Sequence, residues 1–519
     1  MLNVSDSSLL YADRKRGRVI YMYDLKTAVW EITMGCNMRC KHCGSTCTEP
    51  KEGELSTEEA LSLCNSLIEM GMEDITLSGG EPTTRPDWDK IVSCLTSGNV
   101  KTSIITNGWL IDDDVISKVK KAGIYTVCIS IDGLKETHDY IRRQGSFDRD
   151  TLALRKLKEK DISTAVITTV SSANIDELES MYSVFNEIGI DIWQLQIAME
   201  MGNFRTQNEF STKPEYIDKI INFAYSKIGK GIKVTLADCI GYYNLKGIEV
   251  IKDLIPEYEM WQGCGAGKNS IGILHNGDIT ACTSLRDTSF IVGNIRNQSL
   301  REIWEDDNNF KWNRMLTKDK ISGFCGKCQY GSVCLGGCTN SRLCQNDDIY
   351  GENRFCSYHN EMQKELEKIN NSDDQYKLET LFIEELKNEN YQVAEMMAAK
   401  LLQIDANNEK YLEWAGYVNY QLENYLECLN INNKLLKINE SSVNGQKGII
   451  LASINLHRLE DVKSDIYKYS DDTDMEILYD IYLSLINAEY LHEADNLLGK
   501  ICKRSGFEEW RERFEEITV

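Results

Sequence analysis

The fold is decided by the stretch 29-VWEITMGCNMRCKHC-43, in which an apolar run ends directly before a loop with three cysteines. The run at 29–33 predicts a strand, because β-branched and aromatic residues favour extended backbone. Cys36, Cys40 and Cys43 follow with the spacing C-x-x-x-C-x-x-C. Three thiolates so spaced can hold three irons of a cubane cluster and leave the fourth iron without a protein ligand. The spacing alone also leaves open a zinc knuckle or three buried thiols.

The residues from 29 to about 196 alternate short β-branched runs with longer amphipathic runs. In one of the longer runs, 57–70, Ser56 and Glu59 predict a capping box at the helix start. The six strand-like runs are 29–33, 75–77, 102–106, 126–131, 165–170 and 192–196. Six strand-helix units in a row favour the α/β class, with a parallel sheet curled into a partial (β/α)6 TIM-like barrel and its chemistry at the carboxyl ends of the strands.

Glycine-rich and polar turns follow the predicted strands in order. Taken singly, each of these sequences is usually an ordinary turn. Behind a loop with an aromatic residue, His42, before its last cysteine, the series resembles the radical SAM superfamily. The turns are Ser78-Gly79-Gly80-Glu81-Pro82 after the second strand, Thr106-Asn107-Gly108 after the third and Ser130-Ile131-Asp132-Gly133 after the fourth.

This resemblance implies a cofactor and a set of residues that contact it. S-adenosylmethionine would chelate the open iron, and an electron from the reduced cluster would release a 5′-deoxyadenosyl radical. The residues implied to bind S-adenosylmethionine are His42, Gly79, Gly80, Glu81, Pro82, Asn107, Ser130 and Asp132, with Thr169 and Gln196 as further candidates in the adenosyl pocket.

Length and charge bound the remaining possibilities. A chain of 519 residues is long enough for two or three domains. Its net charge of -23 argues against a nucleic-acid partner, which needs a basic face. No run of about 18 apolar residues is present to span a membrane, and no signal peptide is visible at the start. We therefore expect a cytoplasmic protein, in which eighteen cysteines indicate metal thiolates.

A second group of cysteines follows residue 230. Cys264 precedes Gly277 and Cys282, then C-x-x-C-x5-C-x3-C begins at Cys325, and Cys356 closes the series. This arrangement resembles the SPASM extension of peptide-modifying radical SAM enzymes, which holds two auxiliary iron-sulfur clusters. A structural zinc site is the alternative. The resemblance implies three [4Fe-4S] clusters in all, with Cys264, Cys282 and Cys338 at the nearer auxiliary cluster and Cys325, Cys328, Cys334 and Cys356 at the farther one.

This segment departs from its relatives in two places. Some relatives carry a further cysteine shortly before Cys264, but here the preceding residues, PEYEMWQG, contain none. The nearer cluster would then have an open iron, able to bind a substrate thiolate, or would recruit Cys344 or Cys239. Relatives that mature sulfatases have an aspartate directly after the second cysteine of this pair, where this chain has Thr283. The general base is unassigned; the weak candidates are Asp287, Glu200 and Asp238.

The last part of the chain contains an internal repeat. Glu389-Asn390-Tyr391 with Ala394 recurs 34 residues later as Glu423-Asn424-Tyr425 with Cys428. This period resembles the tetratricopeptide repeat and predicts a short all-α solenoid of three to four helix pairs. Such a solenoid can grip a peptide segment, and a packing appendage or a dimer surface is the alternative.

Five segments follow: an N-terminal extension (1–24), a radical SAM partial barrel (25–230), a SPASM domain (231–360), a linker (361–373) and a TPR-like helical domain (374–519). By resemblance, the enzyme modifies a ribosomally made precursor peptide by a thioether or carbon-carbon crosslink, with the solenoid as a candidate leader-binding domain and flavodoxin or ferredoxin as the reductant. The alternatives are maturation of a folded protein of the sulfatase type, peptide epimerisation with Cys47 or Cys239 as hydrogen donor, and a non-catalytic cluster-bearing scaffold.

Overall fold

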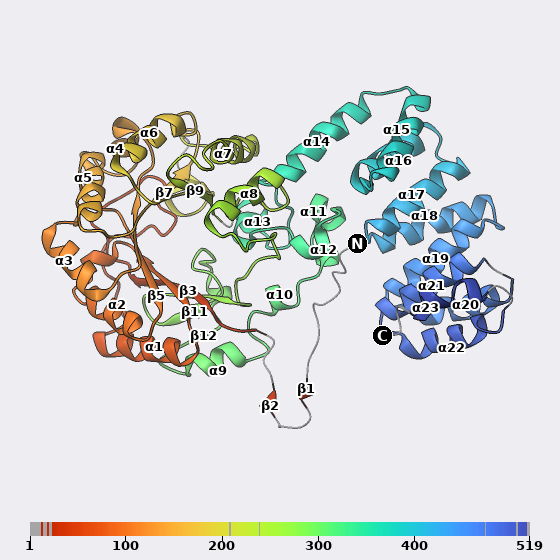
Figure 1. The fold of residues 1–519 in the computed structure, drawn as a ribbon, viewed down its shortest axis with the longest axis horizontal. Coiled ribbons are helices and arrows are strands. Elements are labelled where there is room, and N and C mark those ends of the chain that lie inside the picture. Colours follow the sequence, from red (N-terminus) through yellow and green to blue (C-terminus); the bar gives the residue numbers. More distant parts are fainter. Residues whose placement is uncertain are drawn as a thin grey trace. The chain divides into compact units, whose positions relative to one another are not determined.

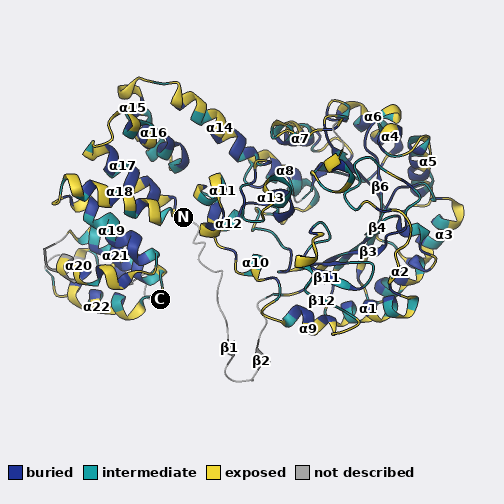
Figure 2. Ribbon diagram, turned by 180° about the vertical axis from the view of Figure 1, so that it is seen from behind, coloured by how far each residue is buried: buried dark blue, intermediate teal, exposed yellow. Residues whose placement is uncertain are grey.

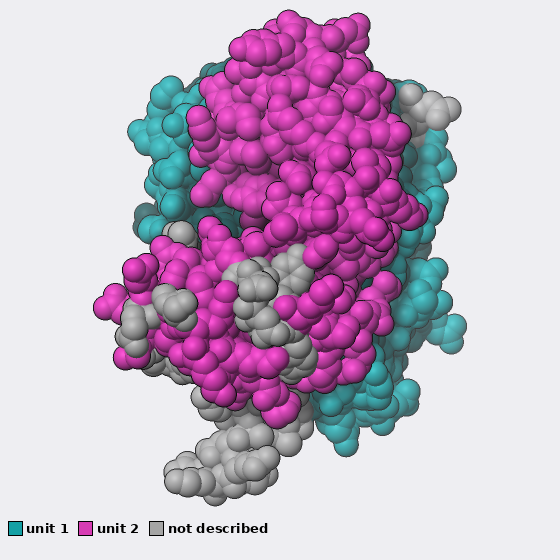
Figure 3. Space-filling model, turned by 90° about the vertical axis from the view of Figure 1, so that its right-hand side faces the viewer, with its two compact units in different colours: residues 1–326, 330–360 teal, residues 327–329, 361–519 magenta. Residues whose placement is uncertain are grey.

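The computed structural model describes residues 12–13, 18–19, 23–206, 209–237, 239–472, 474–504 and 507–515. These residues form two compact units, coloured separately in Figure 3: residues 1–326 with 330–360, and residues 327–329 with 361–519. Most of the predicted N-terminal extension lies outside the described residues. Its two described pieces, β1 (Ala12–Asp13) and β2 (Arg18–Val19), pair with each other in antiparallel fashion.

A ten-stranded sheet organises the first unit, in the order β12-β11-β10-β3-β4-β5-β6-β7-β8-β9. The six predicted strands are present, and neighbours from β3 to β9 are parallel. The predicted α/β class is therefore confirmed. A seventh parallel strand, β9, extends the series past residue 230. The bounds are β3 (Thr27–Thr33), β4 (Asp74–Gly79), β5 (Lys101–Thr106), β6 (Thr126–Ser130), β7 (Thr164–Val170), β8 (Ile192–Ile197) and β9 (Lys233–Leu236).

Helices connect these strands and cover the outer side of the sheet (Figure 1). The predicted capping box is present at α1, where Ser56 and Glu59 each bond the other's backbone. The strands are mostly buried, and the helices expose one side (Figure 2). Between sheet and helices, Trp193 packs edge-on against Phe185 with ring centroids 5.0 Å apart. The helices are α1 (Thr57–Glu69), α2 (Trp88–Ser97), α3 (Asp113–Ala122), α4 (Lys135–Ile141), α5 (Ser146–Glu159), α6 (Leu178–Ile188) and α7 (Glu215–Ser226).

The cysteine-rich segment continues the same sheet. Strand β10 (Ser270–Ile273) lies parallel beside β3, and β11 (Asp278–Thr280) and β12 (Gly293–Asn294) extend the edge in antiparallel fashion. This segment is therefore joined to the strand that leads into the first cysteine loop. Its helices are short: α8 (Leu245–Leu254), α9 (Leu300–Glu305), α10 (Lys311–Arg314), α11 (Gly323–Lys327), α12 (Gly331–Cys334) and α13 (Thr339–Asn346).

The second unit is all-helical and repeats with the predicted period. Its first three helix pairs begin at residues 375, 409 and 443, so they are spaced by 34 residues. Helix α14 (Ser357–Asn370) occupies much of the predicted linker. No described helix is both long and apolar enough to cross a membrane. The pairs are α15 (Gln375–Lys387) with α16 (Tyr391–Ile404), α17 (Glu409–Gln421) with α18 (Tyr425–Ile438), α19 (Val443–Asn455) with α20 (Leu459–Asp472), and α21 (Met475–Asn487) with α22 (Leu491–Ile501); α23 (Arg511–Glu515) follows.

Candidate active site and cluster regions

The loop after β3 brings its three cysteines together. Cys36 N donates to Thr48 O at 2.7 Å, and Cys43 N donates to Cys40 O at 3.3 Å. Burial raises the pKa of Cys40 to about 11; Cys43 and Cys36 add to the rise, while Arg142 opposes it. The three sulfurs thus lie within electrostatic range of one another, the arrangement expected where a bound metal group takes up their negative charge.

Cys43 is the thiol of this loop that is held ready as a thiolate. The Cys47 side chain donates to it, and backbone amides of residues 45–47 add further bonds that outweigh burial. Together they lower the pKa of Cys43 to about 5. Because the thiolate is the form that binds iron, Cys43 is the cysteine of the loop whose surroundings favour the ligating form.

The two glycines at the end of β4, Gly79 and Gly80, press against the start of the cysteine loop. Gly80 N donates to Thr33 O at 2.8 Å. A Cβ on Gly80 would lie 2.2 Å from Gly35 O, and one on Gly79, whose φ is +143°, would lie 2.2 Å from Thr33 O. From the sequence, these glycines are expected to let a ligand approach the backbone closely. In the structure, the missing side chains also leave room for the backbone of the cysteine loop. They fix where the cysteines sit relative to β4.

Glu81 is buried, and its carboxylate is used inside the protein. It accepts from Asn107 N at 2.7 Å, from Thr106 Oγ1 at 2.7 Å and from Thr83 N at 3.1 Å. Burial raises the pKa of Glu81 against these bonds. The side chain therefore joins the ends of β4 and β5, and the groups left to face a ligand in this turn are those of the backbone. Pro82 begins the short helix η1 (Pro82–Thr84) that follows.

Asp132, after β6, is the centre of the site. Its Oδ2 lies 2.7 Å from His42 Nε2 and accepts from Arg142 Nε at 2.5 Å, and its Oδ1 accepts from Thr169 N at 2.7 Å. Burial would raise the pKa of Asp132, but Arg142 and His42 outweigh burial and hold it well below its usual range. An ionised aspartate thus ties the cysteine loop, through His42, to the ends of β6 and β7.

Other predicted contacts cluster around Asp132 and the loop. Gln196 Nε2 donates to Thr169 Oγ1 at 2.8 Å, which links β8 to β7. Asn107 Nδ2 donates to Asn37 Oδ1 at 2.7 Å, inside the cysteine loop. Ser130 ends β6 and is buried. The structure therefore gathers the predicted residues at the carboxyl ends of β3 to β8.

The loop fits a cubane cluster with an open iron. Two of its buried polar atoms, His42 Nδ1 and Asn37 Nδ2, have no hydrogen-bond partner among the described protein atoms. Within the described ranges, no three His, Cys, Asp or Glu side chains converge on one point suited to a single metal ion. In a cubane cluster, each thiolate binds a different iron, so its ligands do not converge on one point.

The cysteines predicted for the nearer auxiliary cluster also meet. Burial raises the pKa of Cys338 well above its usual value, and Cys264, Cys239 and Cys282 each contribute to the rise. Cys264 and Cys282 both pack against the core of the first unit. The group also includes Cys239, which follows β9 and is one of the two cysteines that the sequence offered as a further ligand.

A buried tyrosine connects this group to the next. Tyr242 Oη accepts from Cys338 N at 3.0 Å and from Asn353 Nδ2 at 3.2 Å. Asn353 N in turn donates to Cys325 Sγ at 3.3 Å. Two hydrogen-bonded side chains therefore join a cysteine of the nearer set to one of the farther set.

A buried arginine lies beside both cysteine sets. Arg342 is fully buried, donates to Leu335 O at 2.9 Å, and leaves its Nε without a partner. No described carboxylate lies within ion-pair distance of Arg342. Burial lowers the pKa of Arg342, and Cys264, Cys325 and Cys338 each act to raise it. Thiolate ligands of a bound cluster would offset the charge of Arg342.

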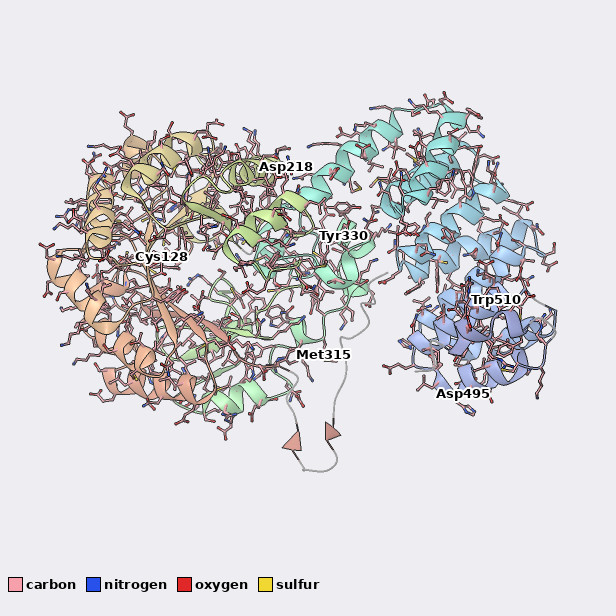
Figure 4. The ribbon with its side chains drawn as sticks, in the orientation of Figure 1. Cys128, Asp218, Met315, Tyr330, Asp495 and Trp510 are labelled. Atoms are coloured by element: carbon pink, nitrogen blue, oxygen red, sulfur yellow. The ribbon has the colours of Figure 1, made fainter. Side chains whose placement is uncertain are left out.

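Three cysteines of the farther set, Cys325, Cys334 and Cys356, belong to the first unit. Burial raises the pKa of Cys356 to about 12, and Cys325 adds to the rise. The next residue, Ser357, donates to Asp218 on α7 at 2.5 Å (Asp218 is labelled in Figure 4). Trp261 Nε1 donates to Cys334 O at 3.2 Å. Cys328 belongs to the three-residue segment that groups with the second unit.

The two described candidate bases, Asp287 and Glu200, are exposed. Asp287 is exposed and caps the helix η3 (Thr288–Phe290) by accepting from Ser289 N at 2.8 Å. Glu200 is exposed near Cys344. Asp238 lies outside the described residues. Cys128, which is in none of the predicted ligand sets, lies on β6 (Figure 4), and burial raises its pKa to about 12.

The sequence interpretation missed four residues that build these sites: Arg142, Tyr242, Arg342 and Asn353. Each acts through contacts with residues distant in the sequence, so no local spacing marks it. The available signal was composition: Arg342 is a cation within the cysteine-rich run 334-CLGGCTNSRLC-344.

Comparison with known proteins agrees with this geometry. The radical SAM superfamily matches residues 30–185, and an iron-sulfur cluster-binding domain, SPASM, matches residues 264–329. An AdoMet-dependent heme synthase of Methanosarcina barkeri is 30% identical over 341 residues, which cover 63% of this chain and 95% of that protein. The mycofactocin maturase MftC of Mycolicibacterium smegmatis is 26% identical, over 63% of this chain and 81% of that protein.

The fold has solved counterparts. The structure of Streptococcus suis SuiB bound to precursor peptide SuiA superposes with a TM-score of 0.54 at 16% identity, over 64% of this chain and 75% of that chain. Fold, domain matches and the heme synthase relative agree. This chain is an enzyme of the radical SAM superfamily that carries a SPASM iron-sulfur domain.

Proposed function

We propose that the enzyme modifies a ribosomally made peptide by hydrogen abstraction, with Cys36, Cys40 and Cys43 as ligands of the radical-generating cluster. The observation that carries the radical chemistry is the Asp132 network, which joins His42 of the cysteine loop to the ends of β6 and β7. When bound, the reduced [4Fe-4S] cluster supplies the electron that splits S-adenosylmethionine into methionine and a 5′-deoxyadenosyl radical.

The chain's own residues then have defined tasks. Cys43 would bind iron as a thiolate, because the Cys47 side chain and the backbone amides of residues 45–47 lower its pKa. Gly79 and Gly80 hold the loop against β4, and Asn107 holds it against β5 through Asn37. Asp132 keeps its charge because Arg142 and His42 stabilise it. These contacts fix the loop before any ligand binds, and preorganisation of this kind lowers the cost of binding.

The auxiliary ligands complete the proposal. Cys264, Cys282 and Cys338 would hold the nearer cluster, and Cys325, Cys328, Cys334 and Cys356 the farther one, giving three clusters in all. Support comes from the mutual effects among Cys264, Cys282 and Cys338, from the pair Cys325 and Cys356, and from the buried charge of Arg342 between them. These clusters would accept or conduct the electron left after hydrogen abstraction, with flavodoxin or ferredoxin as the external reductant.

A peptide substrate is supported by two of the comparisons and by the second unit. MftC is named as a maturase, and SuiB is described with its precursor peptide. The helix pairs of the second unit expose aromatic side chains on the first helix of a pair: Tyr376 on α15 is 81% exposed and Tyr417 on α17 is 51% exposed. Exposed aromatic side chains of this kind suit the binding of a peptide leader, with a tetratricopeptide-like architecture as the framework.

The heme synthase relative supports a second candidate substrate, an iron porphyrin. That relative is matched over 95% of its length by 63% of this chain, so more than a third of this chain has no counterpart in it. The helix-pair unit is best explained as an addition for a larger substrate, which favours the peptide. A sulfatase-type activity is less well supported, because Thr283 replaces the aspartate and Asp287 caps a helix.

The first experiment measures the radical chemistry. Reconstituted protein with dithionite and S-adenosylmethionine should yield 5′-deoxyadenosine, and replacement of Cys36, Cys40 and Cys43 by Ala should abolish it. Each short reading frame beside the gene is then co-expressed, and the peptide mass is measured. Loss of two hydrogens indicates a crosslink. A peptide mass that is unchanged in H2O but increases by one deuterium in D2O indicates epimerisation. Conversion of a supplied iron porphyrin, with every peptide unmodified, refutes the peptide proposal.

The second experiment addresses the helix pairs. Deleting residues 374–519 would change more than peptide binding. Gln329 N donates to Gln392 Oε1 on α16, so the deletion also removes a hydrogen bond next to Cys328. Substitution in the full chain is cleaner: Tyr376→Ala with Tyr417→Ala should weaken peptide binding at least tenfold. Tyr125→Ala, at a 57% exposed tyrosine of the first unit, is the matched control. Equal affinities for both proteins would refute leader binding at these tyrosines.

A further inference from the structure

The nearer auxiliary cluster lacks one ligand when only the predicted cysteines are counted. Cys264, Cys282 and Cys338 supply three thiolates, and the eight residues before Cys264 contain no cysteine. A cubane has four irons, so the fourth is either open or held by a residue from elsewhere in the chain. Whether it is open decides whether a substrate thiol can bind there.

We propose that Cys239 is the fourth protein ligand of the nearer auxiliary cluster, delivered by the turn that follows β9. This inference rests on the proposed assignment of Cys264, Cys282 and Cys338 to that cluster. On binding iron, the Cys239 thiol loses its proton to solvent and forms one iron-sulfur bond.

The turn after β9 is held against the other ligands. Ala237 N donates to Leu195 O at 2.9 Å, and Ile240 N donates to Ala237 O at 2.9 Å, which closes a turn around Cys239. Cys239 packs against the same core as Cys264 and Cys282. Three residues on, Tyr242 accepts from Cys338 N. The turn is therefore tied directly to the backbone of an assigned ligand.

Close packing keeps this tie in place. Tyr242 has a φ of +44°, a left-handed conformation that a tyrosine adopts only when its surroundings hold it. A Cβ on Gly337 would lie 2.5 Å from the Tyr242 ring, so the residue before Cys338 must be glycine for the ring to fit. Burial raises the pKa of Tyr242 well above its usual value, and Cys338 and Cys239 add to the rise, which agrees with both thiols lying within electrostatic range of the tyrosine.

A buried cation, Arg342, lies near these cysteines and needs a negative charge nearby to be stable. Arg342 is fully buried, its Nε has no partner among the described atoms, and it interacts with Cys264 and Cys338. Four thiolates on a cubane carry a net negative charge that this guanidinium offsets.

Cys344, the other candidate, lies in a different environment. Its Sγ is 3.7 Å from Asn340 Oδ1 on α13. Burial raises its pKa to about 11, and the described groups that modify this rise are Arg205, Glu200 and Asp347, with no thiol among them. Cys344 therefore serves as a matched control: a partly buried cysteine of the same segment that lies away from the other thiols.

The test is made in a chain with Cys36, Cys40 and Cys43 replaced by Ala, so that only auxiliary clusters remain. Cys239→Ala and Cys239→Ser are compared with Cys344→Ala and Cys264→Ala by iron content, Mössbauer and EPR spectroscopy. We expect the Cys239 variants to lose one iron per chain on mild oxidation, giving a three-iron signal. The Cys344→Ala protein should match its parent.

A small thiol provides a second readout. Added 2-mercaptoethanol should shift the EPR signal of the reduced Cys239→Ala protein, whose nearer cluster then has a free iron position, and leave the parent unchanged. A shift in the parent, or Cys239 variants with the parent's iron content and spectra, would overturn the inference. If Cys264→Ala also retains both auxiliary signals, the cluster assignment itself fails, which is a distinguishable result.

Discussion

Replacing Asp132 by Asn should destabilise the first unit more than any other single isosteric change near the site. The Asp132 side chain is 0% exposed and the Arg142 side chain 11% exposed, with Arg142 Nε at 2.5 Å from Asp132 Oδ2. Asn retains an acceptor for Thr169 N but removes the carboxylate that is hydrogen-bonded to the buried guanidinium. Removing one partner of a buried pair costs about 3–5 kcal/mol, which is more than a hundredfold in the unfolding equilibrium.

The matched control is Asp148→Asn, the same chemical change in an exposed pair. Lys135 Nζ lies 2.5 Å from Asp148 Oδ2, with side chains 57% and 62% exposed. An exposed pair contributes roughly 0.2–1 kcal/mol, so this variant should unfold close to wild type. Guanidinium unfolding of cluster-loaded protein, followed anaerobically by the cluster absorbance and by near-UV circular dichroism, measures both variants against wild type.

The stability contribution of Asp132 should also depend on pH in a defined direction. The folded-state pKa of Asp132 is held below its unfolded value by Arg142 and His42 in spite of burial. Its contribution to stability is therefore complete above about pH 4 and is lost as pH falls through the folded-state pKa. The gap between wild type and Asp132→Asn should stay constant from pH 8 to pH 5. A gap within about 1 kcal/mol of the Asp148→Asn control would refute the reasoning.

Three further substitutions test other parts of the structure. Gly80→Ala should displace the cysteine loop, because its Cβ would lie 2.2 Å from Gly35 O; iron content should fall while the helical content measured by far-UV circular dichroism is retained, and full iron loading would contradict this. Arg286→Met should leave the buried Glu31 without its partner and lower the unfolding midpoint of the first unit, whereas an unchanged midpoint would show that the pair contributes nothing. Phe382→Ala removes a fully buried ring at a cost of about 3–5 kcal/mol and should lower the denaturant midpoint of the helical far-UV circular dichroism signal; an unchanged midpoint would contradict a packing role for this ring.

The sequence was sufficient for the parts of the fold that repeat. The six parallel strands, the capping box of α1 and the 34-residue helix pairs each have a period or a motif that local preferences set. Strands β9 to β12 were missed because they have two to four residues each and lie in loop-rich sequence, where no alternation can develop. Their place in the sheet is decided by pairing with β8 and β3.

The residues of the candidate site also fall into those that the sequence predicts and those that it does not. Cysteine spacing and strand-end turns mark the thiols and Asp132, because several such residues lie close together in sequence. Arg142, Tyr242 and Arg342 were not foreseen, since each acts on a group brought near only by folding. The candidate bases Asp287 and Glu200 stay predictions: both side chains are exposed, and Asp287 caps η3.

The pairing of β10 with β3 has a consequence for how this enzyme can be divided. Residues Ser270 to Ile273 cover the backbone of Thr27 to Trp30 along one edge of β3. A fragment that ended after β9 would expose that edge, a row of unpaired amides and carbonyls next to the cysteine loop. Exposed edges of this kind recruit other chains. The barrel therefore depends on the later cysteine-rich segment for its solubility as well as for its chemistry, and a truncated chain that separates the two should aggregate before it can be assayed.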